Sequence, residues 1–296
     1  MKKVSVAIVT HNSIKYLPDF LDSVLAQTYF LENNIKPEVI VVDNASSDKT
    51  VNFIKDNFPT VCLLRNVNNI GLPRAWNQAI QMTTGEYLLI MNPDLILDKD
   101  HIKHAVKILD EDQTVATVGG KLYRLKISNI IEGELAELEK TNIIDSCGLR
   151  AYKNRRFIDR GSGTIDKGHF SSKEEIFGIS GSCILYRRSA LEQVKFCNQY
   201  FDEDFFMYKE EIDMAWRLRL AGWTSIYTPD CIGWHHRRAR SQEHASDLSI
   251  IKNRRQKQDF VNFHSYKNHL LLLLKNELPG NYLISESFSN LCNPER

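Results

Sequence analysis

Four short apolar runs alternate with segments of helical spacing in the first third of this chain of 296 residues. The runs lie at residues 4–9, 39–42, 61–64 and 87–91, and none of them contains a strand breaker. Strands that alternate with helices predict βαβ units and a parallel sheet. Because such crossovers are right-handed, the carboxyl ends of the strands gather at one edge of that sheet. We therefore predict an α/β fold with a mostly parallel, Rossmann-like central sheet flanked by helices.

Polar side chains follow each predicted strand at the point where it ends. Four polar loops in the same relative place indicate a ligand site, because open α/β sheets bind ligands outside the carboxyl ends of their strands. We expect the ligand to be a nucleotide. The chain has no GxGxxG after its first strand and no GxxxxGK[ST], which argues against a dinucleotide dehydrogenase and a P-loop NTPase. The residues of this edge are Thr10, Asn12, Asp43, Asn44, Asn69, Asn92 and Asp94.

The fourth run ends abruptly at Asn92-Pro93-Asp94. Pro93 cannot donate a ladder hydrogen bond, so the strand stops there and Asp94 is held at its carboxyl end. A hard carboxylate oxygen in that place suits a divalent cation that carries a diphosphate. Taken alone, the same residues also fit an Asn-Pro turn with a solvated Asp.

A second group of acids opens a predicted helix. Apolar residues between 212 and 218 have helical spacing, and Gly222 suits the C-terminal stop. Glu210, Glu211 and Asp213 fall in the first turn of this helix. They fit two interpretations: either they complement the helix dipole, or one of them is a general base that deprotonates a hydroxyl.

Two later features bear on the same chemistry. Gly178 and Gly181 permit a tight backbone beside a ligand, and equally an ordinary bend into a strand. His235 follows an apolar patch and precedes a basic run. This position fits a metal or diphosphate role, although a lone His is more often a structural residue.

Charge and cysteine content exclude several classes of protein. Lys and Arg number 38 and Asp and Glu 37, and this balance gives no reason to expect a nucleic-acid partner. The six cysteines include no CxxC pair, so we expect a reduced cytosolic protein without a zinc site of the usual spacing. We expect no signal peptide, because an apolar strand follows Met1-Lys2-Lys3 at once. The longest aliphatic run, at residues 270–274, is too short to span a bilayer.

A series of sequence blocks resembles, in order and spacing, the family 2 inverting glycosyltransferases with the GT-A fold. The resemblance runs from Val4 to about Lys275. More narrowly, residues 144–148, Arg160-Gly161 and residues 177–181 look like the bacterial rhamnosyltransferase branch, which typically uses dTDP-L-rhamnose and builds cell-surface polysaccharide on lipid-linked acceptors. The blocks are Val-Ala-Ile-Val-Thr-His-Asn (6–12), Val-Val-Asp-Asn-Ala-Ser-Ser-Asp-Lys-Thr (41–50), Asn-x-Gly (69–71), the DxD-like Asn-Pro-Asp (92–94), the Glu-Glu-Ile-Asp acceptor motif (210–213) and Trp-His (234–235) of the late metal site.

The resemblance implies a role for each of these residues. Asp94 and His235 would bind Mg²⁺ or Mn²⁺ on the diphosphate, and Glu211 would act as the base, with Glu210 and Asp213 as alternatives. Two departures from the family pattern matter, because Asn92 removes a carboxylate near the metal and Glu211 is one methylene longer than the usual Asp. The nucleotide would contact Thr10, Asn12, Asp43, Asn44, Asn69, Gly71, Asn92 and Asp94, with Asp43 and Asn44 on the base. The acceptor would contact Gly178, Ser180, Gly181 and Trp216.

The resemblance also suggests a domain organisation. Residues 1–240 would form the GT-A domain, with a nucleotide-binding half at 1–120 and an acceptor-binding half at 121–240. Between 121 and 173 the pattern weakens, which indicates a long excursion over the acceptor side or a partly mobile region. Residues 241–296 would form a basic amphipathic helical extension. Such a helix either packs on the main domain or lies on an anionic membrane surface.

We therefore expect a metal-dependent hexosyltransferase that moves a sugar to a saccharide or lipid-linked acceptor in bacterial cell-surface polysaccharide synthesis. The favoured donor is dTDP-L-rhamnose, and the alternative donors are UDP- or GDP-sugars. Two other functions stay open: a catalytically degenerate nucleotide-sugar-binding scaffold, and a nucleotidyltransferase, although the latter normally shows a Gly-rich triphosphate loop that residues 10–13 do not provide. We expect a cytoplasmic protein with no nucleic-acid partner, and leave open contact with the inner face of the cell membrane and a homodimer.

Overall fold

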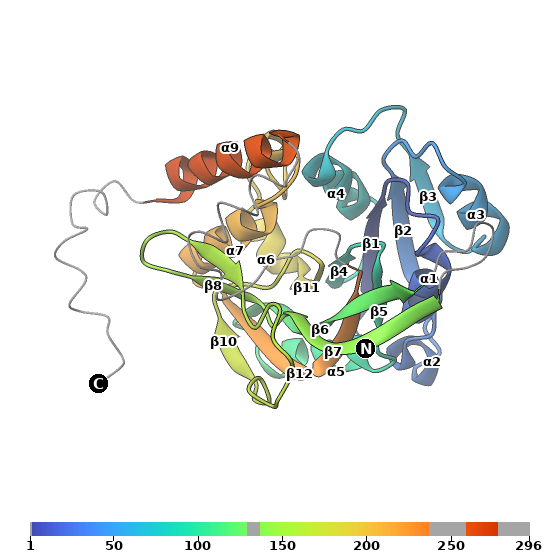
Figure 1. The fold of residues 1–296 in the computed structure, drawn as a ribbon, viewed down its shortest axis with the longest axis horizontal. Coiled ribbons are helices and arrows are strands. Elements are labelled where there is room, and N and C mark those ends of the chain that lie inside the picture. Colours follow the sequence, from blue (N-terminus) through green and yellow to red (C-terminus); the bar gives the residue numbers. More distant parts are fainter. Residues whose placement is uncertain (1, 129–136, 237–258, 278–296) are drawn as a thin grey trace.

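One sheet of ten strands runs through the part of the chain that the structure describes (Figure 1). This structure is a computed structural model, and it describes residues 2–128, 137–236 and 259–277. The strands are β1 (Val4–Thr10), β2 (Glu38–Asp43), β3 (Cys62–Arg65), β4 (Tyr87–Met91), β5 (Leu95–Leu97), β6 (Val115–Ser128), β7 (Glu137–Ser146), β8 (Leu149–Ala151), β9 (Phe157–Asp159), β10 (Glu174–Ile176), β11 (Cys183–Arg187) and β12 (Thr224–His235). Eight of them follow in the order β10-β12-β6-β11-β4-β1-β2-β3, while β5 pairs with β12 and β7 with β6; β8 and β9 form a separate pair.

Six of the eight strands along this path point the same way. β3, β2, β1 and β4 are parallel neighbours. β11 is antiparallel to both β4 and β6, so β6 again points with β4, and β12 is parallel to β6. The exceptions are β11 itself and the edge strand β10, which is antiparallel to β12. The mostly parallel sheet predicted from the alternating pattern is therefore confirmed.

Helices cover both faces of this sheet (Figure 1). They are α1 (Leu17–Leu25), α2 (Thr28–Glu32), α3 (Thr50–Asn57), α4 (Leu72–Gln81), α5 (His101–Glu111), α6 (Arg188–Gln193), the 3-10 turn η1 (Glu203–Phe205), α7 (Glu210–Leu220) and α9 (Asp259–Asn276). All seven residues of β1 are buried, because successive side chains of a strand point to opposite faces. Val6 and Ile8 pack with α1 and α5 on one face, whereas Ala7 and Val9 pack with α4 and α6 on the other.

The chain between β6 and β11 is more regular than the sequence suggested. No period was evident between residues 121 and 173, yet β6 continues to Ser128 and β7, β8 and β9 follow it. β7 pairs with β6 through two register shifts. Such shifts disturb the strict alternation of buried and exposed side chains that a sequence pattern can detect.

β12 continues beyond the point where the sequence ended its last strand. From the sequence, residues 225–227 predict a strand and Pro229-Asp230 a turn, but β12 runs on through both to His235. Its register against β6 shifts between Tyr227 and Ile232, and a bulge is a place in a sheet where proline is tolerated. This continuation carries His235 to the edge of the sheet.

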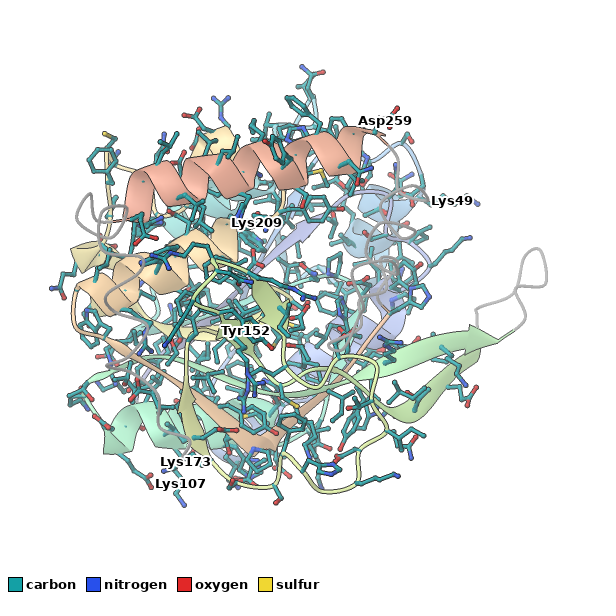
Figure 2. All side chains as sticks on the ribbon, turned by 60° about the vertical axis from the view of Figure 1, so that its left-hand side comes forward. Lys49, Lys107, Tyr152, Lys173, Lys209 and Asp259 are labelled. Atoms are coloured by element: carbon teal, nitrogen blue, oxygen red, sulfur yellow. The ribbon has the colours of Figure 1, made fainter. Side chains whose placement is uncertain are left out.

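The predicted C-terminal helix is present as α9, and one of its faces packs on α7 and η1. Figure 2 shows α9, which begins at Asp259, running over Lys209 at the start of α7. Leu272 is fully buried, whereas Phe263 and Leu274 on the other face are 61% and 79% exposed. Residues 241–258 and 278–296 of the predicted extension, with most of its basic residues, lie outside the described residues. None of the helices in the described ranges has the length and apolar character that crossing a bilayer requires.

Candidate active site

The carboxyl ends of β1 and β2 hold a buried carboxylate. Thr10 and Asp43 are register partners, and the Thr10 hydroxyl donates to Asp43 Oδ1 at 3.2 Å. The backbone N–H of Ser46 donates to Asp43 Oδ2 at 3.0 Å. Asp43 is fully buried, so these two bonds fix its orientation, while an ionised carboxylate can accept about four hydrogen bonds in all. Asp43 is therefore a preorganised acceptor at the predicted nucleotide edge.

Asn12 ties the loops after β1 and β2 together. Its φ of 52° lies in the left-handed region, which Asn tolerates better than most residues. Asn12 Oδ1 accepts hydrogen bonds from the N–H groups of Ser47 at 2.9 Å and Asp48 at 3.3 Å. Its own N–H donates to Ser46 Oγ at 2.9 Å. The side chain that the sequence assigned to the nucleotide thus also shapes the loop.

The side-chain amide of Asn44 is occupied by contacts within the protein. Its Nδ2 atom donates to Asn69 Oδ1 at 2.9 Å and to the Gly71 carbonyl at 3.3 Å. Its Oδ1 atom accepts from the Ile70 N–H at 3.1 Å and from Asn66 Nδ2 at 3.3 Å. Asn44 therefore holds the loop after β3 against the end of β2, and this contact brings Asn69 and Gly71 to the same edge of the sheet.

Gly71 is the point where this loop meets the second half of the chain. Its φ is 86°, and a Cβ atom there would lie 2.7 Å from Cδ2 of Phe206 and 2.8 Å from the Phe206 carbonyl oxygen. The N–H of Leu72 donates to that same carbonyl at 2.7 Å. Both the backbone conformation and the close approach require glycine.

Asp94 and His235 come together through the pairing of β5 with β12. Leu95 and His235 are register partners in this antiparallel pair, and the His236 N–H donates to the Asp94 carbonyl at 2.8 Å. As a result, His235 Nε2 lies 3.2 Å from Asp94 Oδ1. The His235 side chain is 4% exposed and that of Asp94 19% exposed. Solvent or a ligand therefore reaches this pair from the Asp94 side.

Asp145 lies behind His235, and sequence reasoning did not assign it a role. It is fully buried in β7, and its Oδ2 atom is 2.8 Å from His235 Nδ1. Burial alone would lower the pKa of His235, but the carboxylates of Asp94 and Asp145 outweigh burial and raise the pKa to about 10. The one signal in the sequence was the position of Asp145 in the block at residues 144–148.

The donor set around His235 fits a divalent cation that also binds a diphosphate. Within residues 2–128, 137–236 and 259–277, no group of three or more His, Cys, Asp or Glu side chains forms a self-contained metal site. Asp94 and His235 offer one oxygen and one nitrogen, and Mg²⁺ commonly takes one or two carboxylates with the remaining positions filled by substrate phosphates and water. With Nδ1–H directed to Asp145, the Nε2 atom of His235 is the one that would face the ion, and the ion would have to displace the proton that the raised pKa keeps on this ring.

The three acids in the first turn of α7 have different environments. Glu210 is buried, and burial together with the carboxylate of Glu211 raises its pKa well above the usual value. Asp213 is fully buried, and its Oδ2 atom lies 2.9 Å from Arg217 Nε and 3.1 Å from Lys275 Nζ. Glu211 is partly exposed and is the most accessible of the three. Glu211 therefore has the surroundings that best suit a base that must reach a substrate.

Glu211 lies against the backbone of Gly181. A Cβ atom on Gly181 would be 3.2 Å from Cβ and 3.5 Å from Cδ of Glu211. The next carbonyl, that of Ser182, accepts a hydrogen bond from the Asn92 N–H at 2.9 Å. These two contacts connect Glu211 to Asn92, which directly follows β4 and lies two residues before Asp94.

The other residues predicted to bind the acceptor have structural contacts of their own. A Cβ atom on Gly178 would lie 2.5 Å from the Cβ atom of Ala215, so glycine permits close packing of this segment on α7. Ser180 is buried. Trp216 packs edge-on against Phe177, with the ring centroids 6.4 Å apart. Gly178 therefore packs against α7 and Trp216 belongs to it, while Gly181 lies against Glu211.

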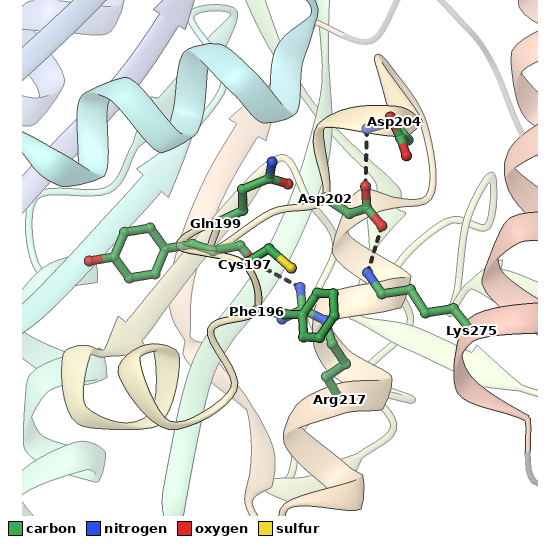
Figure 3. A pocket seen from close by; sticks show the side chains of 8 residues that line it. Phe196, Cys197, Gln199, Asp202, Asp204, Arg217 and Lys275 are labelled. Atoms are coloured by element: carbon green, nitrogen blue, oxygen red, sulfur yellow. Dashed lines mark hydrogen bonds and ion pairs between the residues drawn. The ribbon is translucent and has the colours of Figure 1, made fainter.

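A hollow of about 200 Å³ lies on another side of α7 (Figure 3). Its cations are engaged by the protein: Arg217 donates to the carbonyls of Val194 and Tyr200, each at 2.7 Å, and Lys275 Nζ lies 2.8 Å from Asp202 Oδ2. None of the predicted site residues lines this hollow. Its lining is Phe196, Cys197, Gln199, Tyr200, Asp202, Asp204, Arg217 and Lys275.

Comparison with known sequences finds a family model and several curated relatives that match this chain. The model of the family described as glycosyl transferase family 2 matches residues 5–195. An N-acetylglucosaminyl-diphospho-decaprenol L-rhamnosyltransferase of Mycobacterium tuberculosis is 26% identical over 252 residues, which cover 78% of this chain and 75% of that protein. A poly-beta-1,6-N-acetyl-D-glucosamine synthase of Staphylococcus aureus is 25% identical over 237 residues. The match covers 79% of this chain but only 50% of the synthase.

Solved structures show the same fold at lower sequence identity. S. aureus TarS 1-349 in complex with UDP-GlcNAc matches with a TM-score of 0.57 and 18% identity, over 95% of this chain and 69% of that one. GalNAc-T7 with UDP, GalNAc and Mn²⁺ matches with a TM-score of 0.62 and 15% identity, over 93% and 48%. The mannosyltransferase PcManGT from Pyrobaculum calidifontis, in complex with GDP-Man and Mn²⁺, matches with a TM-score of 0.54 and 18% identity, over 86% and 64%. These similarities confirm the GT-A fold predicted for this chain.

Proposed function

The chain belongs to glycosyl transferase family 2, and on that premise we propose that it moves a sugar from a nucleoside diphosphate to a hydroxyl of a saccharide or lipid-linked acceptor, with inversion at the anomeric carbon. One observation carries the proposal. The Asp94–His235 pair and the accessible acid Glu211 lie at the ends of one short series of contacts, through Asn92, Ser182 and Gly181. In the proposed mechanism this series of contacts would bring the group that binds the diphosphate near the base.

Asp94 and His235 are the residues that would hold Mg²⁺ or Mn²⁺ in this proposal. When bound, such an ion neutralises the negative charge that develops on the leaving nucleoside diphosphate. Asn92 offers an amide where the family pattern has a carboxylate, so the protein supplies one negative charge fewer. We therefore expect an ion that binds well only together with the diphosphate.

The nucleotide would lie along the ends of β1, β2 and β3. Asp43 has a fixed orientation and spare acceptor capacity, which suits recognition of an N–H group of the base. Thr10 and Asn12 lie beside it, and Gly71 lets the loop backbone pack closely against Phe206. The amide of Asn44 is engaged with Asn69 and Gly71, so its contribution would be to hold this loop in place.

Glu211 would be the base that starts the transfer. Its carboxylate takes the proton of the acceptor hydroxyl as that oxygen forms a bond with C1 of the sugar. On the opposite face of the sugar, the bond between C1 and the diphosphate oxygen breaks, and the diphosphate leaves with the electron pair. Burial and the carboxylate of Glu211 raise the pKa of Glu210 well above its usual value, and the buried Asp213 is held in ion pairs, so Glu211 is the better candidate to accept this proton.

The favoured donor is dTDP-L-rhamnose, and the favoured process is the synthesis of bacterial cell-surface polysaccharide. The support is the name of the mycobacterial relative, an L-rhamnosyltransferase. UDP- and GDP-sugars are the alternative donors, because TarS and PcManGT were solved with UDP-GlcNAc and GDP-Man. In this scheme residues 1–120 serve the donor and residues 121–240 the acceptor.

Release of nucleoside diphosphate from a panel of donors tests the proposal. The purified full chain is incubated with dTDP-L-rhamnose, UDP-GlcNAc or GDP-Man, with Mn²⁺ or with EDTA. We expect release that requires Mn²⁺ and is fastest with dTDP-L-rhamnose. Release from a UDP- or GDP-sugar alone would contradict the rhamnose donor. Nucleotide binding with neither hydrolysis nor transfer would favour the scaffold.

Contact with the inner face of the cell membrane is part of the proposal. The support is an apolar stripe on α9, formed by Phe263, Tyr266, Leu270 and Leu274 and between 44% and 79% exposed. Basic residues precede α9 at 252–257 in the sequence, and such a combination favours anionic lipid surfaces. We expect the protein to float with anionic but not with neutral vesicles, and Phe263→Ser with Leu270→Ser to abolish flotation. A homodimer, which the sequence leaves open, is tested separately by light scattering, with a monomer mass as the contrary result.

A further inference from the structure

The segment that leads into α7 has an unfavourable backbone conformation. Phe206, Tyr208 and Lys209 have φ values of 60°, 69° and 71°. L-residues with side chains rarely adopt this left-handed region, and such conformations persist only where the surroundings enforce them. The next two residues are Glu210 and Glu211. The position of the proposed base therefore depends on whatever holds this segment.

Asn268 of α9 binds three carbonyl groups of the segment. Its Nδ2 atom lies 2.7 Å from the carbonyl oxygens of Phe205 and Met207 and 2.8 Å from that of Tyr208. Asn268 is fully buried. Three carbonyl oxygens that converge in a buried place repel one another and are costly without a donor. The two N–H groups of the Asn268 side-chain amide supply the donors, so at least one of them is shared between two carbonyls.

The fourth carbonyl of the segment is bound from the opposite direction. The Phe206 carbonyl accepts from the Leu72 N–H at 2.7 Å, in the loop that carries Gly71. The Phe206 ring stacks on His264 of α9, with centroids 5.1 Å apart. The segment is thus held between α9 and the predicted nucleotide loop, and each of its carbonyls from 205 to 208 has a partner outside it.

α9 also holds Asp213, which lies two residues after the proposed base on α7. Asn276 Nδ2 donates to Asp213 Oδ1 at 2.9 Å, and Lys275 Nζ lies 3.1 Å from Asp213 Oδ2. Because Glu211 and Asp213 are two residues apart, they project from nearly opposite sides of the helix. Contacts from α9 therefore fix α7 on both sides of Glu211 in the sequence.

We propose that Asn268 is a positioning residue for sugar transfer: it holds the carbonyls of residues 205, 207 and 208 so that α7 begins with Glu211 placed against Gly181. This inference rests on the proposed role of Glu211 as the base. A misplacement of about 1 Å at a reacting group lowers turnover roughly 100-fold. The alternative is that Asn268 only adds stability, as any buried residue of α9 would.

Leu272 provides the matched control for that alternative. It lies one turn further along the same face of α9, is fully buried, and packs with Phe205 and Ile212. Leu272→Ala removes apolar packing and lowers stability, but it leaves the amide of Asn268 in place. Asn268→Ala removes the donor, and Asn268→Asp places a carboxylate opposite three carbonyl oxygens.

The test compares turnover, nucleotide affinity and hydrogen exchange in the full-length protein, below the unfolding temperature of every variant. We expect Asn268→Ala to lower kcat about 10- to 100-fold, to leave the Kd of the nucleoside diphosphate with Mn²⁺ unchanged, and to speed exchange of the amides at 206–211. Asn268→Asp should lose more, and Leu272→Ala should keep its kcat. An equal loss of kcat in Leu272→Ala, or an unchanged kcat in Asn268→Ala, would overturn the proposal. Unchanged hydrogen exchange of the amides at 206–211 in Asn268→Ala would also overturn the proposal. This readout does not depend on the sugar donor or on the detection of transfer.

Discussion

The Nε2 atom of His235 lies 3.2 Å from the Oδ1 atom of Asp94, and the pairing of β5 with β12 sets this distance. The sequence predicted the two residues as metal ligands, but it gave no reason for them to meet. They meet because β12 continues past Pro229 and its last residue becomes the register partner of Leu95. The geometry of the proposed metal site is therefore a property of the sheet.

Asp145→Asn is expected to weaken metal binding. Asp145 accepts the Nδ1–H of His235 and so directs Nε2 toward Asp94. Loss of an outer partner of a metal-binding His typically lowers metal affinity 10- to 100-fold. Titration of Mn²⁺ in the presence of nucleoside diphosphate, followed by the electron paramagnetic resonance of free Mn²⁺, measures the change. Equal affinity in the variant and the wild type would show that Asp145 has a purely structural role.

Glu211→Gln should abolish most sugar transfer and leave donor binding intact. General-base catalysis contributes about 10²- to 10⁴-fold to a rate, and the amide keeps the size of the side chain beside Gly181. The rate of nucleoside diphosphate release at saturating donor and acceptor measures the loss, and calorimetry measures donor affinity. Glu210→Gln is the comparison: if Glu210 were the base, its variant would show the larger loss of turnover.

Glu210 should make the stability of the protein fall as the pH rises above the ordinary pKa of Glu. Burial and the carboxylate of Glu211 raise the folded-state pKa of Glu210, so the unfolded chain releases this proton at a lower pH than the folded one. The favourable contribution is complete below the unfolded pKa and is lost as the pH rises through the folded pKa. Urea unfolding should show Glu210→Gln to be more stable than the wild type at pH 8, with the difference shrinking toward pH 4. A difference that does not vary with pH would contradict this assignment.

His101 should produce the opposite dependence in the acid range. It is 2% exposed, and burial lowers its pKa to about 4, with Nδ1 2.9 Å from the Ile232 carbonyl. Between pH 6.5 and 4 the unfolded chain binds a proton that the folded chain does not, so stability is lost as the pH falls. The loss amounts to about 3 kcal/mol, at 1.36 kcal/mol for each pKa unit. We expect the unfolding free energy of His101→Asn to vary less over this range than that of the wild type, and parallel curves would contradict the prediction.

The parallel half of the sheet could be predicted from the sequence because its strands are buried on both faces. A run such as Tyr87 to Met91 is apolar throughout and ends at Pro93, so strand, direction and edge follow from local pattern. β7 and the end of β12 could not be predicted in this way, since register shifts interrupt their pairing with β6. The role of Asp145 depends on that long-range pairing.

α9 shows a different limit of sequence reasoning. The sequence predicted an amphipathic helix from its aromatic residues and leucines, yet Phe263, Tyr266, Leu270 and Leu274 are exposed. The buried face instead carries His264, Asn268, Leu272 and Asn276. Two of these residues bind backbone carbonyls or a buried carboxylate, and such partners leave no trace in hydrophobic periodicity.

Binding of nucleoside diphosphate with and without Mn²⁺ tests the central claim most directly. Thermal unfolding is followed for the wild type and Asp94→Asn with dTDP, UDP and GDP, each in Mn²⁺ and in EDTA. A ligand at 100 times its Kd adds about 2.7 kcal/mol to the stability of the folded state. The proposed site predicts a clear rise in the Tm of the wild type with Mn²⁺ and dTDP, a small one in EDTA, and no Mn²⁺-dependent rise for Asp94→Asn. An equal rise in Tm for the wild type and Asp94→Asn, in Mn²⁺ and in EDTA alike, would contradict it. So would the absence of any rise with all three nucleotides.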